Sequence, residues 1–295
     1  MSLRVRVALA SIGVGLVVLS LKVAAYLLTD SVALLSDAFE TTVNVASSIA
    51  AVIAVWFASR PADSNHPYGH DKAEYFAAVL VGVMIVLAAI SIFAAAWRGY
   101  ASGDTLVFSP LGLAANALAG LINGGWAWYL VRFGTRQRSP ALVADGKHLF
   151  TDVISSFGVL LGVGLVYATG WQVLDSLLAV LVGLVVLWSG WHVMRASVGG
   201  LMDESASAEV LQKIRLLISE HAEGALEAHD LRTRLAGRST FIEFHLVVPG
   251  SMTVETGHRI CDRIEEAISE DIPGARITIH VEPEHKAKHS GIVVL

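Results

Sequence analysis

Residues 140–167 read PALVADGKHLFTDVISSFGVLLGVGLVY, an apolar stretch that is interrupted by ionisable side chains. His148 and Asp152 are four residues apart, so in a helix they lie on one face. Glu40 and Asn44 repeat this spacing in another apolar stretch. Ionisable groups inside a bilayer are costly and mark functional sites. The two pairs therefore predict a divalent cation held between two membrane-spanning helices.

The composition is that of a membrane protein. The chain is 54% hydrophobic and 16% charged, whereas soluble domains average ~25% charged residues. Six apolar stretches of about 20 residues or more follow one another, and each is long enough to cross a hydrocarbon core of ~30 Å. They cover residues 7–28, 31–57, 75–97, 111–131, 140–167 and 171–194. We therefore expect a six-helix transmembrane domain over residues 1–202.

Basic residues fall on alternate connections between these stretches, namely Arg4, Arg6, Arg60, Lys72, Arg132, Arg136, Arg138 and Arg195. Arg98 is the only basic residue near the opposite connections. Because loops rich in Lys and Arg stay in the cytoplasm, both termini are expected to be cytoplasmic. The single cysteine, Cys261, suits a reducing compartment.

The pattern changes after residue 202 to that of a compact α+β domain, expected over residues 203–285 and followed by a C-terminal tail, 286–295. Helical periodicity predicts two helices, and alternation of apolar and polar residues predicts three strands. The helices are expected at 207–220 and 254–269, and the strands at 229–235, 239–248 and 276–281. This α-β-β-α-β order is that of a small open-faced sandwich of the ferredoxin-like or metallochaperone-like kind.

The connection between the second and third apolar stretches contains Asp63, His66 and His70. Two imidazoles and a carboxylate within eight residues are a common source of three ligands for a zinc-type site. Histidines also occur in loops without binding metal, so the spacing alone leaves both interpretations open.

The α+β domain carries histidines on four different elements, His229, His245, His258 and His280, and Glu282 follows His280 on the same strand face. One interpretation is a polar sheet surface. The other is a metal site at which side chains from several elements converge.

Several motifs make the chain resemble the cation diffusion facilitators, the proton-coupled exporters of zinc and related ions, and most closely their bacterial zinc/iron-efflux branch. The resemblance covers nearly the whole chain. It rests on SVALLSDA at 31–38, HPYGHDKAE at 66–74, Ala144-Asp145 with His148 and Asp152, HDLRTR at 229–234 and HVEP at 280–283.

The resemblance implies a homodimer in the inner cell membrane that exchanges divalent metal ions, Zn²⁺ foremost, for protons, with no nucleic-acid partner. By position, Glu40, Asn44, His148 and Asp152 would form the transport site, and Asp63, His66 and His70 a loop site. The cytoplasmic domain would bind regulatory metal across the dimer interface through His229, His245, His258, His280 and Glu282. Lys72 and Asp203 would pair to connect the two domains.

The second-helix pair departs from the family pattern. Zinc exporters of this branch usually carry two aspartates, or a histidine and an aspartate, where this chain has Glu40 and Asn44. One negative charge and one proton carrier are thereby lost, which leaves Fe²⁺, Mn²⁺, Co²⁺ and Cd²⁺ open as main substrates beside Zn²⁺. Asn44 is interpreted as a ligand, and the alternative is an interhelical hydrogen bond worth ~0.6 kcal/mol.

Asp37 and Asp145 each precede the first ligand of a pair by three residues. Either is a candidate to orient a ligand or to relay protons. For Asp145, a position near the inner membrane interface is the preferred expectation.

Two other classes of protein must be weighed. An intramembrane metalloenzyme would hold a catalytic ion, but catalytic zinc sites typically keep three protein ligands and an open position. The sequence has no H-E-x-x-H and no G-x-S-x-G motif. A non-transporting metal sensor is the other alternative, with Asn44 as a sign of lost transport.

Overall fold

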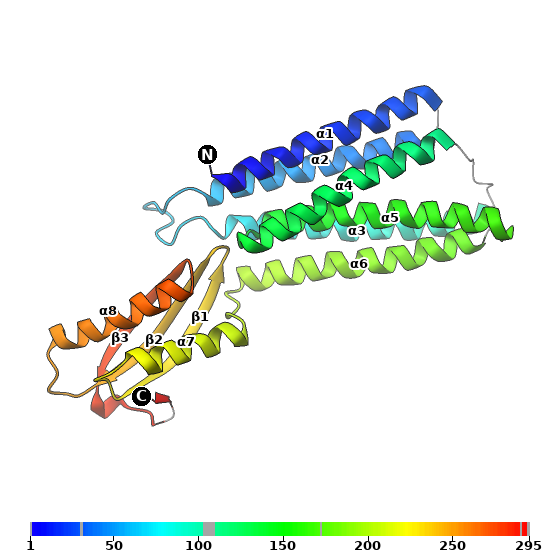
Figure 1. Cartoon of the computed structure of the whole chain (residues 1–295). Coiled ribbons are helices and arrows are strands. Elements are labelled where there is room, and N and C mark those ends of the chain that lie inside the picture. The colour runs from blue at the N-terminus through cyan, green and yellow to red at the C-terminus, as the bar shows by residue number, and fades with distance from the viewer. Residues whose placement is uncertain (1, 30–31, 103–109, 172, 290, 294–295) are drawn as a thin grey trace. The chain divides into compact units, whose positions relative to one another are not determined.

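The computed structural model describes residues 2–29, 32–102, 110–171, 173–289 and 291–293. The chain divides into two compact units, Met1–Val198 and Gly199–Leu295. The first is a bundle of long helices, and the second is a small sheet with two helices (Figure 1).

Six long helices precede residue 202 in the described part of the chain. They are α1 (Leu3–Thr29), α2 (Val32–Ala58), α3 (Ala73–Ser102), α4 (Pro110–Arg136), α5 (Pro140–Thr169) and α6 (Val173–Leu201). At 1.5 Å per residue each is roughly 40–45 Å long. Four helical stretches among the described residues are both long and apolar enough to cross a membrane: Leu3–Ala24, Thr41–Ala58, Ala73–Ala101 and Ser176–Leu201. The expected number of six spans stays a prediction.

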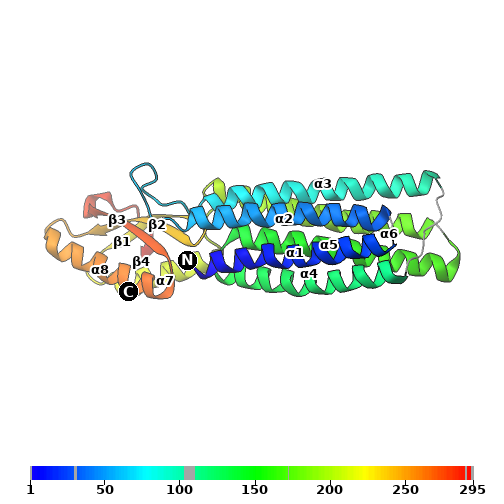
Figure 2. The ribbon, with the colours of Figure 1, turned by 90° about the horizontal axis from the view of Figure 1, so that it is seen from above.

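Small residues allow α4 and α5 to pack closely, and the helices of this unit run alongside one another (Figure 2). A Cβ atom added at Gly146 would lie 2.9 Å from the Leu130 Cβ, and one at Gly134 would lie 3.0 Å from the Leu142 Cβ. Leu130 and Leu142 are fully buried. Glycine at these positions therefore sets the distance between the two helices, as small residues do in membrane helix packing.

A buried ion pair joins α1 to α3. The Arg4 guanidinium lies 2.8 Å from the Glu74 carboxylate, and both side chains are almost fully buried. Ser139, which precedes α5, donates its hydroxyl to the other oxygen of Glu74. Three segments that are distant in sequence thus share one carboxylate.

The second unit contains α7 (Ala208–His221), β1 (Glu227–Ala236), β2 (Ser239–Val248), α8 (Val254–Asp271), β3 (Ala275–Pro283), a 3-10 turn η1 (Glu284–Lys286) and β4 (Ile292–Val293). Both α-helices begin at side-chain caps, since Ser207 accepts from the Val210 N–H and Thr253 from the Thr256 N–H. The expected α-β-β-α-β order is confirmed. The additional strand β4 lies in the segment expected to be a tail.

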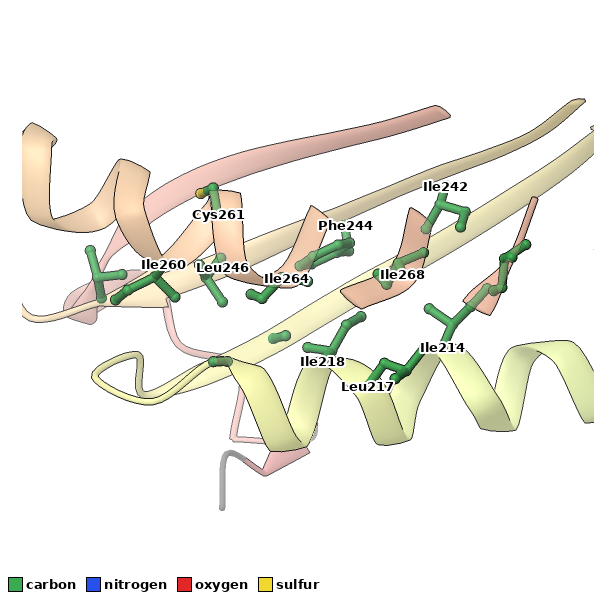
Figure 3. Close-up of a cluster of buried hydrophobic side chains, with 14 residues drawn as sticks. Ile214, Leu217, Ile218, Ile242, Phe244, Leu246, Ile260, Cys261, Ile264 and Ile268 are labelled. Atoms are coloured by element: carbon green, nitrogen blue, oxygen red, sulfur yellow. The ribbon is translucent and has the colours of Figure 1, made fainter. Parts of the chain in front are cut away.

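The four strands form one sheet in the order β3-β2-β1-β4. β1 pairs antiparallel with β2 and with β4. β2 and β3 are parallel, and α8 provides the crossover connection that a parallel pair needs. Both helices pack on one face of the sheet, where Ile214, Ile218, Phe244, Ile264 and Ile268 form the centre of the core (Figure 3). Along β2 the residues that alternate with this core, including Glu243 and His245, belong to the opposite face.

Candidate metal centres

One member of each four-residue pair, Asn44 of α2 and Asp152 of α5, has its side chain next to the other in the helical unit. The Asn44 amide on α2 donates a hydrogen bond to the Asp152 carboxylate on α5. Asn44 and His148 are each 3% exposed and Asp152 is 9% exposed. The other end of the Asn44 amide, Oδ1, is buried and accepts no hydrogen bond from the described residues. This oxygen is therefore available to a ligand.

Two other sequence-predicted residues of α2, Asp37 and Glu40, have side chains outside the described part of the chain. Their backbone belongs to α2, with Glu40 one turn before Asn44. The role of Glu40 as a metal ligand, and that of Asp37 in orienting a ligand or relaying protons, stay predictions.

Asp145 belongs to the buried interior of the helical unit, and its expected position near the inner membrane interface stays a prediction. Its side chain is fully buried, where it accepts hydrogen bonds from Ser11 of α1 at 2.8 Å and from Ser48 of α2 at 3.0 Å. Trp126 of α4 in turn donates its indole N–H to Ser11 at 2.9 Å. A buried carboxylate needs such donors, so Asp145 connects three helices one turn before His148.

The loop between α2 and α3 brings Asp63, His66 and His70 together. The Nδ1 atom of His66 lies 3.1 Å from Nε2 of His70 and 3.3 Å from Oδ1 of Asp63, and Nε2 of His70 lies 3.4 Å from Oδ2 of Asp63. Zinc with ligand bonds of ~2.0–2.1 Å in a tetrahedron separates its ligand atoms by about 3.3 Å. The spacing of the three side chains therefore fits a zinc ion.

Local structure holds these ligands in place. The backbone N–H groups of Asn65 and His66 donate to the Asp63 carboxylate at 2.9 and 2.7 Å. The hydrogen bond from His66 is the main reason why the pKa of Asp63 is lowered, so its carboxylate is kept ionised. His70 is buried against the edge of Phe57, with ring centroids 4.8 Å apart.

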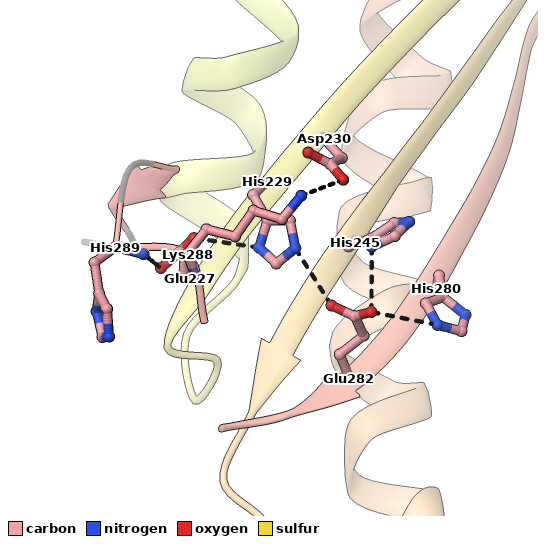
Figure 4. Close-up of polar contacts among 8 residues, drawn as sticks. All are labelled: Glu227, His229, Asp230, His245, His280, Glu282, Lys288 and His289. Carbon is pink, nitrogen blue, oxygen red and sulfur yellow. Dashed lines mark hydrogen bonds and ion pairs between the residues drawn. The ribbon is translucent and has the colours of Figure 1, made fainter. Parts of the chain in front are cut away.

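Three histidines form a row across the sheet of the second unit. In the strand register His229 of β1 is opposite His245 of β2, which is opposite His280 of β3. The ring centroids of neighbours are 5.3 and 4.9 Å apart. Figure 4 shows the three rings gathered around Glu282.

The Glu282 carboxylate is the centre of this row. Its oxygens lie 3.3 Å from Nε2 of His229, 3.3 Å from Nδ1 of His245 and 3.6 Å from Nε2 of His280. His229 is 5% exposed, yet neither of its ring nitrogens makes a well-directed hydrogen bond to a described residue. Buried imidazole nitrogens that face carboxylate oxygens without bonding them fit a metal ligand set.

Asp230 and Glu227 are two neighbours of the row that the sequence analysis missed. Asp230 has a left-handed backbone (φ 54°) within a bulge of β1, and one of its oxygens lies within 4.8 Å of ligand atoms of His229 and His245. Without the bulge, residues 229 and 230 would point to opposite faces. The Glu227 carboxylate lies 3.2 Å from Nδ1 of His229. In the sequence, Asp230 lies in the HDLRTR motif at 229–234, whereas Glu227 has no feature beyond its acidic character that points to the site.

Two predicted relationships extend beyond one compact unit. His258 is exposed on α8 and faces Asp262 at 3.7 Å, so within one chain it is not brought to the histidine row, and its role across a dimer interface stays a prediction. Asp203 lies 3.6 Å from Arg234 of β1. Its pairing with Lys72, which belongs to the other unit, also stays a prediction.

The fold and these ligand groups define a class of protein, a helical membrane protein that handles metal cations. Comparison with known families agrees: the cation efflux transmembrane domain matches residues 8–202, and the cytoplasmic domain of cation efflux proteins matches residues 206–284. The chain belongs to the cation efflux, or cation diffusion facilitator, family. The expected architecture of a helical membrane domain with a cytoplasmic α+β domain is thereby confirmed, and the family is one of transporters rather than enzymes.

Related proteins cover most of the chain. An uncharacterized transporter of Synechocystis sp. is 46% identical over 276 residues, which are 94% of this chain and 89% of the relative. The cation-efflux pump FieF of Shigella boydii is 30% identical over 281 residues, which are 94% of this chain and 92% of the pump. A solved chain of a candidate zinc transporter, CzrB, in its zinc form is 49% identical and covers 29% of this chain and 98% of its own, with a TM-score of 0.28.

Proposed function

We propose that the protein exports a divalent cation, Zn²⁺ foremost, from the cytoplasm in exchange for protons. The observation that carries this proposal is the buried group of Asn44 on α2 with His148 and Asp152 on α5. Polar and ionisable side chains at such a place in a membrane domain are expensive unless they serve a function. A mixed nitrogen and oxygen ligand set suits zinc, which binds more tightly than Mn²⁺ or Fe²⁺ to most such sites.

Proton exchange follows from the chemistry of these ligands. A metal binds to neutral imidazole and to ionised carboxylate, so loading the site releases protons. An imidazole with an ordinary pKa near ~6.5 is then protonated again when the site opens to a more acidic side. Glu40 and Asp152 supply two negative charges and Asn44 supplies none, so the site loaded with a dication is close to neutral.

The transport cycle that we infer is alternating access by a homodimer of six-span protomers in the inner cell membrane, with both termini in the cytoplasm. Asn44 and Asp152 would part from each other to admit the ion, since their hydrogen bond occupies one carboxylate oxygen. The loop group and the histidine row would bind cytoplasmic metal as a regulatory ligand. Lys72 and Asp203 would couple the two units. The relatives named as cation-efflux pumps support the direction of transport.

Transport into proteoliposomes tests the proposal. The purified protein is challenged with Zn²⁺, Fe²⁺, Mn²⁺, Co²⁺ and Cd²⁺, with and without a pH gradient, and Asp152→Ala serves as the matched inactive variant. We expect gradient-dependent Zn²⁺ flux that Asp152→Ala abolishes while the dimer persists. Metal binding without flux of any ion would instead identify a sensor.

A further inference from the structure

The residues after β3 fold back over the acidic neighbours of the histidine row. We name residues 287–289 and 291–293 the C-terminal strap. The backbone N–H groups of Lys288 and His289 donate to the Glu227 carboxylate at 3.2 and 2.9 Å, and β4 pairs with β1 at Glu227 and Ala228. The Lys288 ammonium lies 2.6 Å from the Asp230 carboxylate (Figure 4).

Both anchors of the strap are carboxylates that also face the histidine row. Glu227 approaches His229 through the same oxygen, Oε1, that accepts from the Lys288 backbone. Asp230 belongs to the group of ligand atoms formed with His229 and His245. The strap therefore places a positive charge on a carboxylate of the metal centre.

The contact between Lys288 and Asp230 contributes little to the stability of the fold. The Lys288 side chain is 50% exposed and that of Asp230 is 32% exposed, and ion pairs as exposed as this are weak in water. A dication bound by His229, Asp230 and His245 would repel the ammonium at close range and would compete for the same carboxylate. The strap and the metal ion would thus compete for the carboxylate of Asp230.

We propose that Lys288 is an internal competitor that sets the metal affinity of the cytoplasmic domain, so that metal binding at His229, Asp230 and His245 displaces the strap. This inference rests on the cytoplasmic metal binding proposed above. Because coupling between two binding events is reciprocal, a strap that metal displaces must itself weaken the binding of metal by the same factor. The strap then keeps the domain metal-free until cytoplasmic metal rises.

Gly291 offers a way to detach the strap without changing any charge. A Cβ atom at this position would overlap the carbonyl oxygen of Ala228, so Gly291→Ala should disrupt the pairing of β4 with β1. Lys288→Gln removes the ammonium, and Lys288→Arg keeps the positive charge as the matched control.

The test measures Zn²⁺ affinity of the full-length protein by chelator competition, in a background of Asp152→Ala and His70→Ala that removes the other two candidate sites. We expect Lys288→Gln and Gly291→Ala to bind Zn²⁺ about 5–150-fold more tightly than the background protein, which is the usual range of such couplings, and Lys288→Arg to bind as the background does. Zn²⁺ should also accelerate trypsin cleavage after Lys288, followed by mass spectrometry.

Unchanged or weaker Zn²⁺ binding in both Lys288→Gln and Gly291→Ala would overturn the competition, as would protection of Lys288 from trypsin by Zn²⁺. These results would leave the cytoplasmic metal centre itself in place. Absence of Zn²⁺ binding by the background protein and by both variants would instead overturn that metal centre, and the inference with it.

Discussion

The side-chain amide of Asn44 donates a hydrogen bond to the Asp152 carboxylate and so joins α2 to α5 in the buried part of the helical unit. The amide nitrogen is bonded to a carboxylate oxygen that a cation would need as a ligand. The amide oxygen of Asn44 is buried and accepts no hydrogen bond from the described residues. In the transport cycle proposed above, Asn44 would hold Asp152 while the site is empty and would be a ligand once the ion is bound. This proposed double role would distinguish the chain from family members that have an acidic residue at this position.

Asn44→Asp should change ion preference and proton dependence. A carboxylate at this position faces Asp152 in place of an amide, so the empty site must hold a proton to avoid repulsion between like charges. We expect Zn²⁺ flux in proteoliposomes to depend more steeply on pH than in the wild type. Asn44→Ser, which is neutral, serves as the control. Identical ion preference and pH dependence in Asn44→Asp would show that Asn44 is not a ligand.

Glu282→Ala should weaken metal binding to the cytoplasmic domain far more than His258→Ala does in a protein held as monomers. Glu282 faces three histidines, whereas His258 is exposed and faces Asp262. Loss of a carboxylate that only orients histidine ligands already costs about 10–100-fold in affinity, so we expect at least this loss for Glu282→Ala. Zn²⁺ titration of both variants, as monomers and as dimers, measures the difference. Equal losses of Zn²⁺ affinity in the two monomeric variants would contradict the placement of Glu282 at the metal centre and of His258 away from it.

Arg4→Met should destabilise the helical unit, because it leaves the Glu74 carboxylate buried without its partner cation. Removal of one partner of a buried ion pair costs about 3–5 kcal/mol, whereas replacement of both by apolar residues is often close to neutral. Thermal unfolding in detergent should therefore show a lower Tm for Arg4→Met than for the double variant Arg4→Met, Glu74→Met. The reverse order would mean that the pair is not desolvated.

Gly146→Ala should separate α4 from α5. The added Cβ would lie 2.9 Å from the Leu130 Cβ and 3.0 Å from the backbone nitrogen of Val131, and overpacking of this kind costs about 1–3 kcal/mol. Gly125→Ala is the matched control on α4, since among the described residues its Cβ would meet no atom within 4 Å apart from the neighbouring backbone of its own helix. Unfolding in detergent compares the two. A Tm of Gly146→Ala equal to that of the control would contradict this close packing.

Cys261 should react slowly with thiol reagents. Burial in the core of the α+β domain raises the pKa of its thiol, and the nearby carboxylates of Glu265 and Asp262 raise it further. A raised pKa lowers the thiolate fraction at neutral pH, and the thiolate is the reactive form. Iodoacetamide labelling, followed by mass spectrometry, should be slow in the folded protein and fast in denaturant. Fast labelling of the native protein would contradict the burial.

The regular elements were predictable because their patterns are local. Alternation of apolar and polar residues placed a strand at 239–248, where β2 is found. The strand β4 was not predicted, since two residues, Ile292 and Val293, carry no period and become a strand only through pairing with β1. Its formation depends on residues more than sixty positions earlier in the chain.

The residues of the sites were only partly predictable, and the missing part depends on tertiary structure. His245, His280 and Glu282 follow from strand alternation, but the position of Asp230 depends on a bulge that reverses this alternation. The hydrogen bonds of Asp145 were not predicted, because its hydroxyl partners, Ser11 and Ser48, are on other helices and far away in sequence.

The pairing of β4 with β1 has a consequence for how the sheet meets other polypeptides. An uncovered edge strand offers free N–H and C=O groups on which a second chain can add, and this is a route to aggregation. β4 pairs with β1 at Glu227 and Ala228, just before His229 of the histidine row, and so covers the edge of β1 there. Ile292 and Val293 thus cover this edge of the sheet, and truncation before Gly291 should make the domain prone to self-association.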